Sequence, residues 1–224
     1  SELGLEGGLI QQRETAEYSA AYRAACEPMR GETTLLPRTL PQLFESSLDR
    51  RRSMVLAGSA GSRVRSAARL LAEAAVLSGL WAAQRDDYPV TVKSGHSLAQ
   101  LVFDPERSSA LGASEPDALL VLSQDGYRKV KALLERMSER CDVFVLPGFE
   151  RIDTRARVHV VDPASGPRVA RPLQTLVAST AMTSCLGWLP DAALEEAARR
   201  GARSGHIEAN LEAVAAGIEL AKRC

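Results

Sequence analysis

The stretch VLAGSAGSRV, from Val55 to Val64, is the part of the sequence best suited to bind an anion. Gly58 and Gly61 would leave backbone N–H groups bare at the start of a helix, where phosphates bind. The stretch has neither the G-x-G-x-x-G spacing of dinucleotide-binding loops nor the G-x-x-x-x-G-K-S/T of P-loops. Arg63 and Arg65 favour an anion, because cations at a helix start oppose the helix dipole unless a negative group offsets them. From the residues alone, a tight strand-to-helix turn and a phosphate contact both remain open.

A second polar stretch, DDYPVTVKSGHS, precedes an apolar run with strand character. It contains Lys93, Ser94, Gly95 and His96, and turns of this composition are where binding groups collect. These residues are candidates for contact with an anionic cofactor or a partner surface. A single histidine such as His96 is more often a hydrogen-bonded surface residue than a catalyst. No Ser/His/Asp set, carboxylate pair or metal-ligand spacing accompanies it, so we predict neither a catalytic residue nor a metal site in this chain.

Charge and cysteine usage exclude several functional classes. The 28 basic and 28 acidic residues cancel, which leaves no long-range attraction for nucleic acid or an anionic membrane. No apolar stretch reaches the roughly 20 residues of a membrane-spanning helix, and no signal-peptide pattern is present. The 4 cysteines are too dispersed for a CxxC or Cys/His cluster, which indicates buried apolar residues or free thiols. We predict a cytoplasmic protein that binds neither membrane nor nucleic acid.

The elements that must position these stretches alternate between strand and helix from Ser53 onwards. Short apolar runs with strand character cover residues 53–57, 80–84, 97–104, 117–123, 142–148 and 157–162. Helical periodicity covers residues 62–79, 127–141, 177–188, 190–201 and 206–223. Strands separated by helices predict a Rossmann-like α/β fold, in which a mostly parallel sheet carries helices on both faces.

The first part of the chain, residues 1–52, has a different character. A helical pattern over residues 9–26 is followed by Pro28, Gly31, Pro37 and Pro41, which interrupt any regular element. This part contains too little apolar material to fold alone, so we expect an arm that docks on another surface. The predicted organisation is an N-terminal arm, residues 1–52, followed by one α/β domain, residues 53–224.

The order of these pieces resembles the gamma subunit, or gamma domain, of the 2-oxoacid:acceptor oxidoreductases. The resemblance rests on the glycine stretch, LAEAAVLSGL, YPVTVKSGHS, the strand LAQLVF, PDALLVLS, LGWLPDAALEEAARR and NLEAVAAGIELA. It extends from Ser53 to about Leu220 and implies that LAQLVF is an edge strand.

Members of this family oxidatively decarboxylate 2-oxoacids, usually to acyl-CoA, with thiamine diphosphate, Mg²⁺ and 4Fe–4S clusters, and pass the electrons to ferredoxin or another acceptor. The resemblance implies a non-catalytic subunit that holds none of these cofactors and packs on alpha, beta and ferredoxin-like delta subunits. It also implies that the two polar stretches face coenzyme A. The residues expected to bind this cofactor are Gly58, Ser59, Gly61, Ser62, Arg63, Tyr88, Lys93, Ser94, Gly95 and His96.

The chain departs from the family pattern at three of these positions. The family often has a further glycine and an acidic or amide residue where this chain has Ser62 and Arg63, and glycine is common at the position of His96. These departures favour an aryl or other non-pyruvate 2-oxoacid, such as phenylglyoxylate. Without the resemblance, the same glycine stretch indicates a stand-alone nucleotide-binding regulatory domain, and the arm indicates a scaffold that clamps neighbouring chains.

Overall fold

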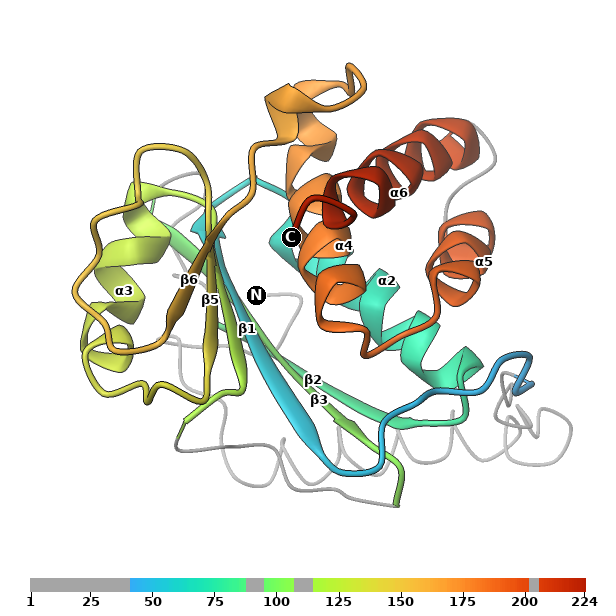
Figure 1. The fold of residues 1–224 in the computed structure, drawn as a ribbon. Coiled ribbons are helices and arrows are strands. Elements are labelled where there is room, and N and C mark those ends of the chain that lie inside the picture. The colour runs from blue at the N-terminus through green and yellow to red at the C-terminus, as the bar shows by residue number, and fades with distance from the viewer. Residues whose placement is uncertain (1–40, 88–94, 107–114, 202–205) are drawn as a thin grey trace, which may run out of the picture. The chain divides into compact units, whose positions relative to one another are not determined.

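The computed structural model describes residues 41–87, 95–106, 115–201 and 206–224. The expected helix and prolines 28 and 37 of the arm lie outside these ranges, as do Tyr88, Lys93 and Ser94. In the unit Leu40–Cys224, six strands form one sheet of order β2-β3-β1-β4-β5-β6 (Figure 1). The strands are β1 (Arg52–Ser59), β2 (Trp81–Asp87), β3 (His96–Asp104), β4 (Ala118–Val121), β5 (Asp142–Val145) and β6 (Arg157–Val160).

Parallel pairing prevails on one side of β1 and antiparallel pairing on the other. Strands β1, β4, β5 and β6 are parallel neighbours, whereas β3 runs antiparallel to both β1 and β2. The expectation that LAQLVF forms an edge strand is wrong, because β2 pairs along the free side of β3 and becomes the edge. Burial agrees with this order: Leu101 and Val102 of β3 are buried, while Trp81 of β2 is 50% exposed.

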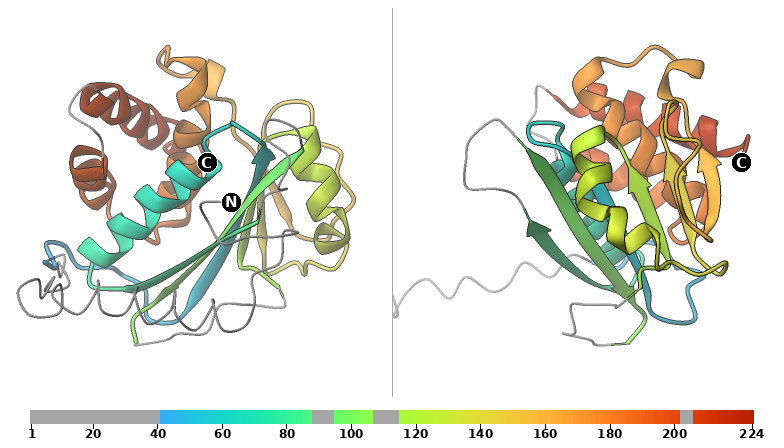
Figure 2. Two further views of the ribbon diagram at one scale, coloured as in Figure 1. Left: turned by 180° about the vertical axis from the view of Figure 1, so that it is seen from behind. Right: turned by 90° about the vertical axis from the view of Figure 1, so that its left-hand side faces the viewer.

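Helices cover both faces of the sheet, which confirms the predicted α/β class (Figure 2). Helices α2 (Val64–Leu77) and α4 (Gln174–Leu186) pack on one face, and α3 (Gln124–Leu134) packs on the other. Helices α5 (Asp191–Gly201) and α6 (Ile207–Ala221) form a further layer against α2 and α4. Short 3₁₀ turns, η2 (Pro163–Ser165) and η3 (Arg171–Leu173), precede α4. None of the helices in the described ranges is long and apolar enough to cross a membrane.

The core explains why the short apolar runs became strands. Strands β4 and β5 are buried along their whole length, as continuous apolar runs covered by helices on both faces must be. The larger core lies between the sheet and α2 and α4, around Leu71, Phe103 and Leu120. A smaller core joins the sheet to α3 through Val143 and Leu134.

The last residues of the predicted arm, 41–51, lie on the α/β domain itself. The backbone N–H groups of Leu43 and Phe44 donate to the carbonyl of Leu77 at 2.8 and 3.0 Å. The Ser46 hydroxyl donates to the carbonyl of Trp188 at 3.0 Å. These contacts attach the segment to the end of α2 and to the connection between α4 and α5.

Candidate binding site at the carboxyl ends of the parallel strands

The connections that follow β1 and β4 diverge to opposite faces of the sheet. Helix α2 follows β1 and packs on one face, whereas α3 follows β4 and packs on the other, although β1 and β4 are adjacent and parallel (Figure 1). Ligands of open α/β sheets bind where neighbouring strands send their helices to opposite faces. The predicted glycine stretch forms one side of this switch point, and residues 122–126 form the other.

The two glycines of the first connection have different roles. A Cβ atom on Gly58 would lie 2.7 Å from the Ser62 hydroxyl and 2.8 Å from a methyl group of Val64, so glycine lets the turn fold back on β1. Gly61 has φ of +83°, and a Cβ atom there would meet nothing within 4 Å. Among the residues that the structure describes, Gly61 therefore faces open space in a conformation that favours glycine, whereas Gly58 serves internal packing.

The two serine hydroxyl groups of the turn each donate a hydrogen bond within the protein. Ser62 Oγ donates to the carbonyl of Ser59 at 2.7 Å. Ser59 Oγ donates to Asp125 Oδ2 at 3.0 Å, which joins the two connections of the switch point. Both serines were predicted to bind cofactor, and the structure gives their hydroxyl groups a role in holding the turn.

Residues at the start of α3 belong to this site, and our sequence interpretation missed them. The Ser123 hydroxyl accepts from the N–H of Gly126 at 3.1 Å and caps the helix. A Cβ atom on Gly126 would overlap the carbonyl of Ala57 and lie 2.7 Å from the nitrogen of Gly58. The signal is present in the sequence, because SQDG follows the buried run DALLVL as a capped strand-to-helix turn.

Arg63 is the charged residue of the turn that remains available. It has φ of 62°, a left-handed conformation that is uncommon outside glycine. Its side chain has no hydrogen bond or ion pair with the residues that the structure describes, whereas Arg65 pairs with Asp86 at 2.9 Å. Helix α2 has no acidic residue in its first turn and no side-chain cap. The turn therefore combines an available guanidinium group with the positive end of a helix dipole.

The second predicted stretch meets the glycine turn where the structure describes it. The N–H of Ala60 donates to the carbonyl of Gly95 at 2.8 Å, and His96 pairs with Ser59 in the register of β1 and β3. Gly95 and His96 thus lie beside the turn. The roles of Tyr88, Lys93 and Ser94 remain predictions, since these residues lie outside the described ranges.

A small charged cluster surrounds His96. Its Nε2 atom is buried, has no hydrogen-bond partner among the described residues and lies 3.7 Å from Asp87 Oδ1. Lys129 Nζ of α3 lies 3.1 Å from the other oxygen of Asp87, and this hydrogen bond lowers the pKa of the Asp87 carboxyl group. The cluster joins β2, β3 and α3 beside the switch point.

A hollow of about 440 Å³ opens beside the glycine turn. It is lined by Gly61, Arg63, Val64, Arg65, Ser66, Arg69, Gln84, Asp86 and Ser97. With three guanidinium groups and one carboxylate, this lining suits an anion more than a cation. Across the described ranges, no group of three or more His, Cys, Asp or Glu side chains could hold a metal ion.

Three cysteines and His159 lie away from the glycine turn in the sequence. Cys141 is buried, Cys185 is half-buried and Cys224 is exposed, and all three are free thiols. The His159 ring stacks on the Phe144 ring with 4.7 Å between the ring centroids, and its Nε2 lies 2.8 Å from Asp142 Oδ1.

Fold and site together define an α/β domain whose switch point is suited to an anionic ligand. The family model for pyruvate ferredoxin/flavodoxin oxidoreductase matches residues 53–220. The chain therefore belongs to this family of oxidoreductases, which confirms the predicted resemblance. No curated protein matches the chain in a sequence search.

Solved structures of related architecture support the assignment of the fold. The gamma subunit of a keto/oxoacid ferredoxin oxidoreductase from Geobacter sulfurreducens PCA is 22% identical, with a TM-score of 0.63 over 77% of this chain and 99% of that one. Pyruvate oxidoreductase subunit PORC from Thermotoga maritima is 21% identical, with a TM-score of 0.58 over 76% and 97%. The 2-oxoglutarate:ferredoxin oxidoreductase from Magnetococcus marinus, with 2-oxoglutarate, coenzyme A and succinyl-CoA bound, is 19% identical, with a TM-score of 0.66 over 79% of this chain and 32% of that one.

Proposed function

We propose that this chain is the non-catalytic gamma subunit of a multi-subunit, cytoplasmic 2-oxoacid:acceptor oxidoreductase that converts a 2-oxoacid to an acyl-CoA. The observation that carries the proposal is the family match over residues 53–220, combined with a fold shared with a solved gamma subunit along nearly all of that subunit's length. In this proposal, thiamine diphosphate, Mg²⁺ and the 4Fe–4S clusters belong to alpha, beta and ferredoxin-like delta subunits. This chain packs on the thiamine-binding subunits.

Within the complex, the glycine turn contributes to the site of coenzyme A. The structure with coenzyme A bound, from Magnetococcus marinus, shares this fold. In the present chain, Gly61 leaves open space and Arg63 has a guanidinium group available to hold a phosphate through two parallel hydrogen bonds. Coenzyme A supplies the thiol that accepts the acyl group, and this chain binds and orients its charged end without transferring a proton or an electron.

The role of Arg63 is testable in the assembled enzyme. Replacing it by Gln removes one charge-assisted contact, which corresponds to an increase of about tenfold or more in KM for coenzyme A. The KM for the 2-oxoacid should stay unchanged. Arg136→Gln is the matched control, because Arg136 is exposed and its side chain donates to the Ala132 carbonyl at the far end of α3, away from the glycine turn. Equal KM values for coenzyme A in the two variants would refute the role of Arg63.

The substrate is a 2-oxoacid other than pyruvate, with an aryl acid such as phenylglyoxylate as the leading candidate. The support comes from the departures from the family pattern that the resemblance implies at Ser62, Arg63 and His96. Ser62 and His96 both lie beside Ser59 at the end of β1. A kinetic panel of pyruvate, 2-oxoglutarate, phenylglyoxylate and indolepyruvate tests this preference. A clear preference for pyruvate would refute the proposal of a substrate other than pyruvate.

The first experiment is to purify the tagged chain from its native source without oxygen and to analyse its partners by native mass spectrometry and visible absorption. We expect a brown complex with larger chains that contains thiamine diphosphate and reduces ferredoxin with a 2-oxoacid and coenzyme A. A colourless 24.1 kDa monomer or homo-oligomer would refute the proposal. Tight binding of an adenine nucleotide to that species, measured by calorimetry, would establish the stand-alone regulatory domain instead.

A further inference from the structure

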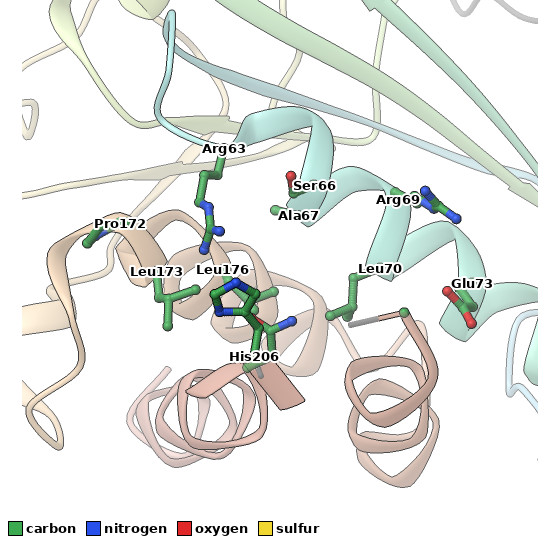
Figure 3. A pocket seen from close by; sticks show the side chains of 12 residues that line it. Arg63, Ser66, Ala67, Arg69, Leu70, Glu73, Pro172, Leu173, Leu176 and His206 are labelled. Carbon is green, nitrogen blue, oxygen red and sulfur yellow. The ribbon is translucent and has the colours of Figure 1, made fainter. Parts of the chain in front are cut away.

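A second cavity, of about 320 Å³, lies between α2 and the outer helical layer. Its walls come from α2, from η3 and the start of α4, from the end of α5 and from the start of α6 (Figure 3). Segments separated by more than a hundred residues in sequence thus enclose one space. Its volume lies at the small end of the range for pockets that bind small molecules. We call this space the α2–α6 cavity.

The floor of the α2–α6 cavity is apolar. Ala67 and Leu70 of α2 and Leu173 and Leu176 of η3 and α4 line it, and each is at most 7% exposed. These side chains belong to the main core, so their positions are set by packing. They present a preformed apolar surface to a compact ligand. Because this surface is already ordered, its rearrangement on binding costs little free energy.

The charges at the rim of the cavity are distributed unevenly. Arg63 reaches from the start of α2 towards His206 at the start of α6, as Figure 3 shows. At the other end, Glu73 lies near Arg69 and Arg200; burial raises the pKa of the Glu73 carboxyl group, and both arginines oppose this. The cation at the Arg63 end has no counterpart among the described residues.

We propose that the α2–α6 cavity binds a small monocarboxylic acid with an apolar body. The carboxylate pairs with Arg63 beside His206, and the body lies on Leu70, Leu173 and Leu176. One guanidinium group matches one carboxylate through two parallel hydrogen bonds. Within this cavity, the Glu73 carboxylate at the other end of the rim disfavours a dianion such as phosphate, whereas the hollow beside the glycine turn does not include Glu73 in its lining. This site is distinct from the coenzyme A site proposed above, but Arg63 lines both hollows, so its guanidinium group holds either the carboxylate or the phosphate and not both at once.

The experiment uses the full 224-residue chain with labelled leucine methyl groups and titrates 4-methylpentanoate, observed by NMR. We expect saturable shifts at Leu70, Leu173 and Leu176, and no comparable binding of the neutral 4-methylpentanamide. Arg63→Gln should weaken binding by about tenfold or more, and Arg136→Gln should leave it unchanged.

Several results would overturn this proposal. These are equal binding of the amide, unchanged affinity in Arg63→Gln, absence of shifts at millimolar acid, or shifts confined to other leucines. A further variant, Asn210→Tyr, tests the location by narrowing the cavity at its rim, and should weaken binding without removing a charge. Because the readout is binding to this chain alone, its failure would leave the subunit proposal untouched.

Discussion

Replacing Gly126 by alanine tests the packing that forms the switch point. The added Cβ atom would overlap the Ala57 carbonyl and lie 2.7 Å from the Gly58 nitrogen. The backbone of β1 cannot retreat, because it is hydrogen-bonded to β3 on one side and β4 on the other. Helix α3 must therefore move away, which would also weaken the cap that Ser123 provides.

The expected change in the free energy of unfolding combines one stabilising effect with two destabilising effects. In a helix without such a contact, Gly→Ala stabilises by up to about 1 kcal/mol. Overpacking against a rigid neighbour costs about 1–3 kcal/mol, and loss of a helix cap costs about 1 kcal/mol. We expect the free energy of unfolding of Gly126→Ala to fall by about 2–3 kcal/mol, because the neighbouring atoms are backbone.

Guanidinium denaturation of the full chain, followed by far-UV circular dichroism, measures this change. Gly201→Ala is the matched control at the end of α5, where a Cβ atom would meet, among the described residues, only the flexible carboxylate of Glu73 at 3.1 Å. We expect its free energy of unfolding to stay within about 1 kcal/mol of the wild type. Wild-type stability in Gly126→Ala would show that α3 does not pack on β1 as described.

Three further predictions concern other parts of the domain. Gly217→Ala should lower the free energy of unfolding by about 2 kcal/mol in the same assay, because its Cβ would lie 2.6 Å from Thr180 Cβ where α4 and α6 cross. An unchanged free energy of unfolding would contradict this packing. Burial, helped by the neighbouring Cys224, raises the pKa of Cys185 to about 12, so iodoacetamide at pH 8 should modify exposed Cys224 well before Cys185. Peptide mass spectrometry measures the two rates, and equal rates would refute the assigned burial. Arg63→Gly should raise the free energy of unfolding by about 0.5–1 kcal/mol, since glycine adopts φ of 62° without strain. A midpoint of thermal denaturation below that of the wild type would contradict this.

Local patterns in the sequence determined the elements and their order. Strands β1, β4 and β5 were recognisable because short apolar runs bounded by turn residues are typical of strands buried between two helical layers. The glycine stretch at the end of β1 identified one side of the switch point, because its unusual residues follow a strand and precede a helix. The ordered combination of such stretches also identified the family.

Tertiary structure decided what local patterns do not encode. The apolar character of β3 would be the same at the edge of the sheet or inside it. Its position inside the sheet follows from its pairing with β2, which the sequence of β3 alone does not show. The sequence does not show that the Ser59 hydroxyl has a partner, whereas in the structure it donates to Asp125, which follows a different strand. The α2–α6 cavity lies where the side chains of four segments leave space between them. The hydrophobic periodicity of any one of these helices does not predict such a cavity. Periodicity shows which face of an element is buried, whereas the partner that buries it is chosen by the packing of the whole chain.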